Sequence, residues 1–568
     1  MNSAGSAAGP GSVPAGTGGG TSASGLGTDA PASVSAPGPW TTGPGHDPGY
    51  PASGPGLGTG IPEPGAGRTG RVLGWLAVAG IGTALLIMIA TSLVRGDWMF
   101  PHLVIPSPGP PWTVTGVRVP AGVIYIALWI SAAVGAGGVA VGLLAAQRGA
   151  RPPMRLLLTG ALIAVVALTV LPPVGSSDAF DYAAYGRIAL LGHSPYVLTP
   201  SYLRHAHTAF SLSVPRKWQH AVSVYGPLAT AEQFFAAKLG GLSMARVTFW
   251  LKLWNSIVFL TVALVMDRLL RADPVWRLRA HLLWTVNPLL LWDLIAAGHL
   301  DVLAAGAGLL GLLALGTSPG AVKVSLPRVI AAGALIGVAA DIKINYLLFG
   351  VGLAWALRRS PARLAAAACG GLAVLGLGYA WYGIPAVKAI LKRRNTLSAN
   401  SFYLHLVGYN HRALTHIGLI ALVLVVAAAA LLLWRAPAGL ADRPAIRPAL
   451  AVCAAWLFFW PYQLPWYDAM LICLLVFYPA SWFDWLVLAR LAAGTLSNIP
   501  GNPWSPASHL AAVIEYQLVG RIAPLLLFGA AIALVLLACS GRWRPYQLEL
   551  RPAVGWREQP ELVSSTSR

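Results

Sequence analysis

Charged residues are scarce in this chain, and acidic residues are the scarcest. Only 10% of its 568 residues are charged, and Asp and Glu together number 19. A soluble protein carries about a quarter charged residues, so this shortage excludes a large soluble domain. The hydrophobic fraction of 56% indicates a membrane protein instead. The 39 Lys and Arg residues lie in short clusters between apolar runs, a pattern that the positive-inside rule explains without nucleic-acid binding.

Cysteine and the common catalytic motifs are also lacking. The four cysteines lie inside apolar runs without the spacing of metal ligands, so we interpret them as small core residues. No P-loop, dinucleotide-binding glycine motif, HExxH or hydrolase GxSxG motif occurs in a matching context. These absences argue against an enzyme that uses ATP or a nucleotide sugar. No cofactor is expected to be required, and use of a divalent metal ion stays open.

The two ends of the chain differ from its middle in composition. Residues 1–67 are mostly Gly, Pro, Ser, Ala and Thr, which cannot bury enough apolar surface to offset the entropy of ordering. They predict a disordered cytoplasmic tail without the features of a signal peptide. Residues 68–545 form the predicted membrane domain, and the basic residues near 541–551 predict a cytoplasmic C-terminal tail over 546–568.

Long apolar runs predict an all-α polytopic membrane protein. Since a spanning helix needs about 20 apolar residues, we expect a bundle of roughly 11–14 transmembrane helices, with outer-face juxtamembrane helices and no large soluble domain. The clear runs are 72–94, 120–146, 154–174, 247–267, 281–298, 302–317, 361–384, 414–434, 447–464 and 518–540, and the shorter or interrupted ones are 222–240, 329–358 and 468–494.

The basic clusters set the expected orientation. Arg68 and Arg71 precede the first run, and three arginines lie in 148–155 before the third. Both clusters are predicted to be cytoplasmic. The third run then leads outward, so 175–241 becomes the first outer loop with juxtamembrane helices. The topology of 468–517 stays open.

Two of the few carboxylates, Asp178 and Asp181, directly follow the third run. Nearly one helical turn separates them, so both can face one side of a helix. Asp178 is either a helix N-cap or a general base that deprotonates an acceptor hydroxyl in a group transfer. Asp181 is either a solvated helix position or part of a sugar-binding site.

The same segment holds Tyr182, Tyr185, Tyr196 and Arg187. The tyrosines form either an interfacial aromatic belt or a wall on which a sugar stacks. Arg187 either reaches toward lipid headgroups or binds a phosphate. The sequence alone leaves both alternatives open.

Ionisable residues also occur at the ends and in the middle of later runs. His299 and Asp301 follow the 281–298 run, and Lys343 lies inside 329–358. Such groups are costly inside a membrane and indicate function by default. His299 and Asp301 either stay at the interface or contact a ligand. Lys343 needs a carboxylate, for which Asp341 is close in sequence, or an anionic ligand such as a carrier-lipid phosphate.

Two more segments are predicted to reach the outer face. The loop 384–412 carries Arg393 and Arg394 within a basic run that breaks the positive-inside rule. This run binds either a ligand phosphate or anionic headgroups. The segment "FWPYQLPWYD" (459–468) adds Trp466 and Tyr467. The sequence therefore predicts a polar, aromatic-lined cavity that opens outward.

Taken in order, "DAFDYAAYGRIALLGHSPY", "VYGPL", "NPLLLWDLIAAGHLD", "ADIKINYLLF" and "QLPWY" are similar to motifs of a known family. The chain resembles the GT-C glycosyltransferases of actinobacteria, in particular the polyprenol-phosphate-mannose-dependent α-(1→6)-mannosyltransferases, over about residues 70–550. The resemblance implies inverting mannosyl transfer at the outer face of the plasma membrane. The implied partners are a polyprenyl-phosphate-mannose donor, a glycan or glycolipid acceptor and membrane lipids, but no nucleic acid.

The resemblance also implies roles for single residues. Asp178 corresponds to the catalytic aspartate, whereas Asp181 occupies a position that the family fills variably. His299-Leu300-Asp301 departs from the family's His-Asn-Asp. The implied donor-phosphate ligands are Lys343, Arg393, Arg394 and Arg187, and the implied sugar or acceptor contacts are Asp181, Tyr182, Tyr185, Tyr196, His299, Asp301, Trp466 and Tyr467. A transporter or flippase of a lipid-linked glycan is the alternative, although the internal repeats expected of one are not evident.

Overall fold

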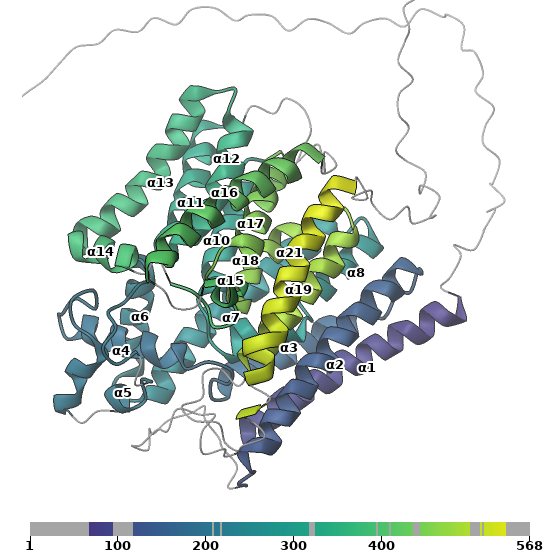
Figure 1. Ribbon diagram of the computed structural model, residues 1–568, viewed down its shortest axis with the longest axis horizontal. Coiled ribbons are helices and arrows are strands. Elements are labelled where there is room, and N and C mark those ends of the chain that lie inside the picture. Colours follow the sequence, from purple (N-terminus) through teal and green to yellow (C-terminus); the bar gives the residue numbers. More distant parts are fainter. Residues whose placement is uncertain are drawn as a thin grey trace, which may run out of the picture. The chain divides into compact units, whose positions relative to one another are not determined.

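The computed structural model describes residues 67–94, 117–206, 209–215, 218–316, 324–392, 396–407, 411–435, 444–499, 512–513 and 516–540 (Figure 1). Both predicted tails lie outside these residues, apart from Gly67. Within the described ranges the regular structure is helical, and no strand occurs. The prediction of an all-α polytopic membrane protein is therefore confirmed.

Six helices of the described chain are long and apolar enough to cross a membrane, or seven if one bent pair counts as a span. They are α1 (Arg68–Leu93), α2 (Ala121–Gln147), α7 (Met244–Leu270), α13 (Pro361–Tyr382), α16 (His411–Arg435) and the final helix formed by η5 (Leu518–Ile522) with α21 (Ala523–Ser540). Each covers a predicted apolar run.

The other predicted runs form shorter or broken helices. The run that begins at 281 is split into α8 (Pro274–Leu283), α9 (Pro288–Leu290) and η2 (Leu291–Ala296). The following helix, α10 (Asp301–Leu313), is bent by 114° from this segment. Gly298 lies in the break with φ +78°, a left-handed conformation that glycine adopts without steric cost. The break places the end of η2 and the start of α10 inside the bundle, and it brings the polar residues next to it into the interior.

A second break divides the run 329–358. It becomes α11 (Leu326–Ile342), η3 (Ile344–Leu348) and α12 (Phe349–Leu357), separated at Lys343, which is extended with φ −151° and ψ 117°. The remaining short helices of the bundle are α3 (Met154–Val170), α17 (Ile446–Phe459), η4 (Pro465–Tyr467), α18 (Asp468–Leu475) and α19 (Trp482–Asn498).

A group of helices at one end of the bundle does not cross it (Figure 1). It contains α4 (Asp178–Leu190), η1 (Pro200–Ala206), α5 (Ala209–Leu212) and α6 (Pro227–Gly240). Pro227 starts α6 at a position where its missing N–H costs nothing. Helix α4 packs closely on α6, because Gly186 has no Cβ that would collide with the Gln233 backbone. These helices occupy the predicted juxtamembrane segment 175–241. The further short helices α14 (Ile384–Lys392) and α15 (Phe402–Val407) follow α13.

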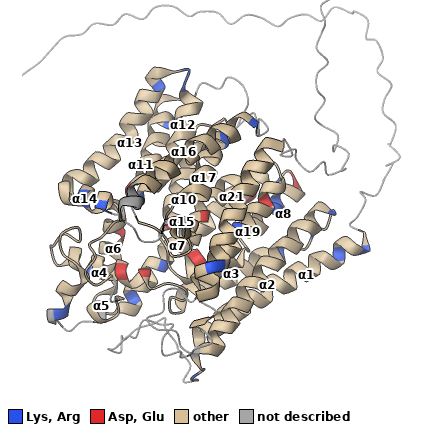
Figure 2. Ribbon diagram, viewed as in Figure 1, with Lys and Arg blue, Asp and Glu red and all other residues tan. Residues whose placement is uncertain are grey.

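Charged residues are few on the bundle (Figure 2), and one buried ion pair joins three of its helices. Arg279 of α8 is 4% exposed. Its Nε and Nη2 donate to the Asp484 carboxylate of α19 at 2.6 and 2.5 Å. The same guanidinium donates to the carbonyls of Leu475, the last residue of α18, and Tyr478 just beyond it. The C-terminal end of a helix favours such a cation. One arginine therefore ties α8 to α18 and α19.

Replacement of Arg279 by Met should destabilise the protein strongly. It leaves the Asp484 charge buried without its partner, which typically costs about 3–5 kcal/mol. Chemical unfolding in mixed micelles measures the effect. Arg271→Met, at an exposed position near the end of α7, is the matched control and should change the unfolding free energy by less than about 0.5 kcal/mol. Similar losses in both variants would contradict the role of the pair.

Candidate functional site

Residues from five separate segments meet where the two broken helices face α4. The segments are the start of α4, the loop before α6, the break before α10, the junction of α11 with η3, and η4. We call this group the central cluster; its members are Asp178, Tyr182, Tyr225, His299, Asp301, Lys343, Tyr346, Trp466 and Tyr467. Six of the predicted site residues besides Asp178 are thus brought together with it.

Asp178 is the first residue of α4, and its carboxylate faces the break before α10. Ser177 holds the N-cap position without a side-chain cap hydrogen bond, so the interpretation of Asp178 as the N-cap is wrong. Its Oδ2 lies 3.6 Å from His299 Nδ1, and its side chain is 16% exposed. In the loop before α4, Gly175 has φ +94°, and a Cβ at this position would collide with the ring of Trp292. Asp178 is therefore a held but accessible carboxylate.

His299 is fully buried beside Asp178. Its ring stacks on Trp466 with 3.5 Å between ring centroids and 17° between ring planes. Its carbonyl accepts a hydrogen bond of 3.0 Å from Asn255 Nδ2 of α7. The stacking and the backbone contact fix the imidazole against the Asp178 carboxylate.

Lys343 pairs with Asp301 and not with Asp341, its neighbour in sequence. Lys343 Nζ donates to Asp301 Oδ2 at 2.7 Å, and Tyr346 OH donates to Asp301 Oδ1 at 3.2 Å. Nζ also lies 4.2 Å from the centroid of the Tyr467 ring, a cation–π contact. Asp301 is fully buried, whereas the Lys343 side chain is 11% exposed. Asp301 thus supports a lysine whose side chain remains partly exposed.

The tyrosines of α4 and its following loop point inward. Tyr182, Tyr185 and Tyr196 are at most 4% exposed, so the interpretation as a lipid-facing aromatic belt is wrong. Tyr182 meets Tyr225 edge to face at 5.0 Å. Tyr196 OH donates to the Tyr225 carbonyl at 2.9 Å, and a 2.8 Å hydrogen bond joins it to Thr230 Oγ1. Tyr196 therefore holds the segment that carries Tyr225.

Burial raises the pKa of the Tyr182 and Tyr225 hydroxyls, and the negative charge of Asp178 acts in the same direction. Both hydroxyls therefore stay protonated at neutral pH and can donate hydrogen bonds. Tyr185 lies nearly one helical turn after Tyr182 in α4, and its hydroxyl donates to the Ala221 carbonyl at 3.1 Å.

Other predicted residues lie elsewhere or are not described. The Arg187 guanidinium is 6.0 Å from the centroid of the Phe210 ring, a contact with α5 rather than with the central cluster. Asp181 is 6% exposed, so it is not a solvated helix position. Arg393 and Arg394 lie outside the described residues, and their predicted role stays a prediction.

Three residues near the centre were not among the predicted site residues. Tyr225 and Tyr346 lie inside the segments "VYGPL" and "ADIKINYLLF", but nothing in their spacing distinguishes them from core tyrosines. Lys252 is fully buried in α7, and its Nζ donates to the Leu171 carbonyl at 2.8 Å, just before the loop to Asp178. A lysine inside an apolar run was a signal that could have identified it.

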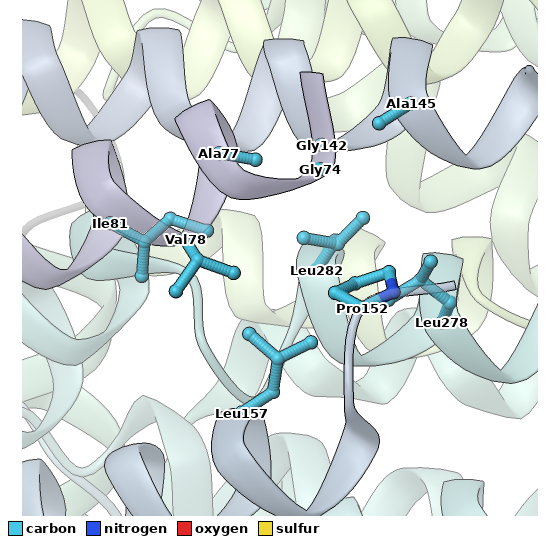
Figure 3. Close-up of a pocket in the computed structure, with 10 residues that line it drawn as sticks. All are labelled: Gly74, Ala77, Val78, Ile81, Gly142, Ala145, Pro152, Leu157, Leu278 and Leu282. Carbon is cyan, nitrogen blue, oxygen red and sulfur yellow. The ribbon is translucent and has the colours of Figure 1, made fainter. Parts of the chain in front are cut away.

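A pocket elsewhere in the bundle has the wrong chemistry for a polar ligand. It lies among α1, α2, α8 and the start of α3, and Figure 3 shows its lining, which includes Gly74, Ala77, Leu157 and Leu282. Every lining residue is apolar or glycine. The central cluster is therefore the better candidate site.

Comparisons with known proteins agree on one family. Residues 77–359, about half of the chain, match the family model described as alpha-(1->6)-mannopyranosyltransferase, N-terminal domain. A probable alpha-(1->6)-mannopyranosyltransferase of Mycolicibacterium smegmatis (strain ATCC 700084 / mc(2)155) is 28% identical over 155 residues. This match covers 27% of the chain and only about a quarter, 26%, of the relative's length. The central cluster lies within the family match except for Trp466 and Tyr467.

Gly226→Ala should disturb the site by pushing α6 away from α11. Gly226 has an ordinary φ of −75°, but a Cβ there would overlap the carbonyl oxygen of Asp341. Such overpacking typically costs about 1–3 kcal/mol and would shift Tyr225. Gly82→Ala in α1, where a Cβ meets no atom within 4 Å, should be neutral or slightly stabilising. Unfolding in detergent measures both, and equal stability of the two variants would contradict the close approach.

Proposed function

Because residues 77–359 of this chain belong to the alpha-(1->6)-mannopyranosyltransferase family, we propose that the protein is an inverting, membrane-embedded mannosyltransferase of the GT-C type. Its proposed donor is polyprenyl-phosphate-mannose, and its proposed acceptor is a growing lipid-linked or cell-envelope mannan that gains an α-(1→6) linkage. The observation that carries this proposal is an accessible carboxylate, Asp178, in one cluster with an accessible lysine, Lys343.

Lys343 is the proposed ligand of the donor phosphate. Asp178 and Asp301 both act electrostatically on its ammonium group, but only Asp301 forms a close pair with it. An ammonium has three donor hydrogens, so Lys343 can hold Asp301 and still donate to a phosphate oxygen. Positive charge at this place stabilises the charge that develops on the leaving phosphate. We keep Arg393, Arg394 and Arg187 as predicted additional ligands of this phosphate.

Asp178 is the proposed general base. Its carboxylate accepts the proton of an acceptor mannose hydroxyl, and the hydroxyl oxygen forms a bond to the anomeric carbon. The bond between that carbon and the donor phosphate oxygen breaks, and the polyprenyl phosphate leaves with the electron pair. A β-linked donor thus gives an α-linked product in one displacement. One base suffices for this mechanism, so no second carboxylate is needed.

The neighbouring residues are proposed to shape the acceptor site. His299, fixed on Trp466, orients Asp178 from the buried side. Tyr182 and Tyr225 form an aromatic wall whose hydroxyls can donate to a sugar. Asp301 acts through Lys343, because both of its oxygens are already hydrogen-bonded. The predicted sugar contacts of Asp181, Tyr185, Tyr196 and Tyr467 belong to the same proposal, with Tyr196 acting through Tyr225.

The site is proposed to open to the outer face of the plasma membrane. Support comes from the arginines at the start of α1 and around the junction of α2 with α3, which the positive-inside rule assigns to the cytoplasm. Asp178 follows α3 at the end opposite to these arginines. A donor whose carrier lipid lies in the bilayer can reach such a site without leaving the membrane.

Asp178→Asn should abolish most of the transfer activity. The amide keeps the size of the side chain but cannot accept the acceptor proton, and loss of a general base typically lowers kcat about 10²–10⁴-fold. The measurement is transfer of radiolabelled mannose from polyprenyl-phosphate-mannose to an oligomannoside by purified protein.

Asp273→Asn, at the exposed N-cap of α8, is the matched carboxylate control and should retain activity. Wild-type activity in the Asp178→Asn variant would refute the assignment of the base. Movement of a labelled lipid-linked glycan across vesicles without any transfer would instead support a transporter.

Lys343→Met should impair the step in which the phosphate leaves. Removal of one preorganised charge that stabilises a transition state typically lowers kcat about 10²–10³-fold. Asp301→Asn should have a smaller effect, because the lysine stays while its support weakens. Steady-state kinetics with varied donor concentration measure both. A Lys343→Met variant with unchanged kcat and raised donor KM would show that the lysine only binds the donor.

A further inference from the structure

Helix α14 presents three distinct faces. Its alanines, Ala386 and Ala389, are at most 5% exposed, and they pack in a cluster with Tyr196. At 3.6 residues per turn, Ile384, Val387 and Leu391 fall on one stripe. Their side chains are 68%, 43% and 53% exposed. A monomeric protein rarely leaves so continuous an apolar stripe in water.

The third face of α14 is basic. Lys388 and Lys392 are both exposed, and they are four residues apart, so they lie on one stripe. The helical period places the two lysines beside Ile384, so they flank the apolar stripe on the side away from Val387. Figure 2 shows basic positions on α14. In the described chain neither lysine forms an ion pair with a carboxylate.

The position of α14 in the chain places it at a membrane boundary. It follows α13, a candidate span of 22 residues, which is about 33 Å long and enough for the hydrocarbon core. Trp381 at the end of α13 is 84% exposed, and tryptophan favours the interface. Gly383, with φ +68°, then turns the chain into α14.

We propose that α14 is an interfacial helix that binds anionic phospholipid. The Ile384–Leu391 stripe lies against the acyl chains, and Lys388 and Lys392 contact the phosphate-bearing headgroups beside them. Amphipathic helices with a basic flank bind anionic membranes in this way. The ligand is a structural phospholipid of the leaflet rather than a transferred group, so the proposal goes beyond sugar transfer and does not depend on it.

The lipid-binding helix is also joined to the central cluster. Its alanines pack on Tyr196, and Val222 and Tyr382 pack against the same cluster. Tyr196 in turn donates to the Tyr225 carbonyl. Anionic lipid bound beneath α14 therefore stabilises, through Tyr196, the segment that carries Tyr225.

Residue-specific photo-crosslinking tests the proposal in the full-length protein. p-Benzoylphenylalanine replaces Val387, and the protein is placed in nanodiscs with equal amounts of phosphatidylcholine and phosphatidylglycerol. Mass spectrometry after illumination gives the ratio of the two crosslinked lipids. We expect phosphatidylglycerol to be enriched about fivefold or more, because each of the two surface lysines favours an anionic lipid by about fivefold.

Charge-removing and charge-keeping variants provide the controls. Lys388→Gln with Lys392→Gln should return the ratio to about one, as expected when the attraction to anionic headgroups is lost. Lys388→Arg with Lys392→Arg should keep the enrichment. The same crosslinker at Leu377 on α13, which is 78% exposed, should show no preference in any variant.

Three outcomes would overturn the proposal. The first is crosslinking of position 387 to protein instead of lipid, which would show that another segment covers the apolar stripe. The second is an enrichment that survives loss of both lysines. The third is displacement of phosphatidylglycerol by a small amount of added polyprenyl phosphate, which would assign α14 to the donor.

Discussion

The ion pair between Lys343 and Asp301 is the interaction on which the central cluster depends. A charge transferred into an apolar bundle costs several kcal/mol unless a partner compensates it. Asp301 begins α10 after one helix break, and Lys343 lies in the other break between α11 and η3. The pair therefore joins the two helix breaks that lie beside α4. Tyr346 donates a hydrogen bond to Asp301, and the ring of Tyr467 packs against the Lys343 ammonium. These contacts fix the side of the cluster that faces Asp178.

The same constraint explains why so few carboxylates occur and where they lie. Asp484 accepts from Arg279, Asp468 pairs with Arg490, and Asp293 accepts from Thr495 at 2.9 Å. Each of these aspartates is at most 2% exposed and serves packing between helices. Asp178 differs because its side chain is 16% exposed and its basic neighbour is an imidazole at 3.6 Å. Asp178 therefore combines partial exposure with a weakly basic neighbour, and a proton acceptor requires such an accessible carboxylate.

The surroundings of the site connect sugar chemistry to the bilayer. Tyr196 contacts the alanines of α14 on one side and the Tyr225 backbone on the other. A helix that binds anionic lipid and a wall that binds an acceptor sugar would thus share one tyrosine. This arrangement would place the acceptor site at the depth of the headgroups, where a carrier-lipid phosphate also lies.

The sequence by itself determined the fold class and pointed to most residues of the central cluster, because the cost of buried charge can be read from a chain with few charges. Asp178, His299, Lys343 and Trp466 were identified in this way or by their order in familiar motifs. The tertiary structure decided the rest. It gave Lys343 the distant Asp301 as its partner, turned the tyrosines of α4 inward, separated Arg187 from the cluster and added Tyr225 and Tyr346. Partner choice and side-chain direction depend on which helices pack together, and neither hydropathy nor spacing contains that information.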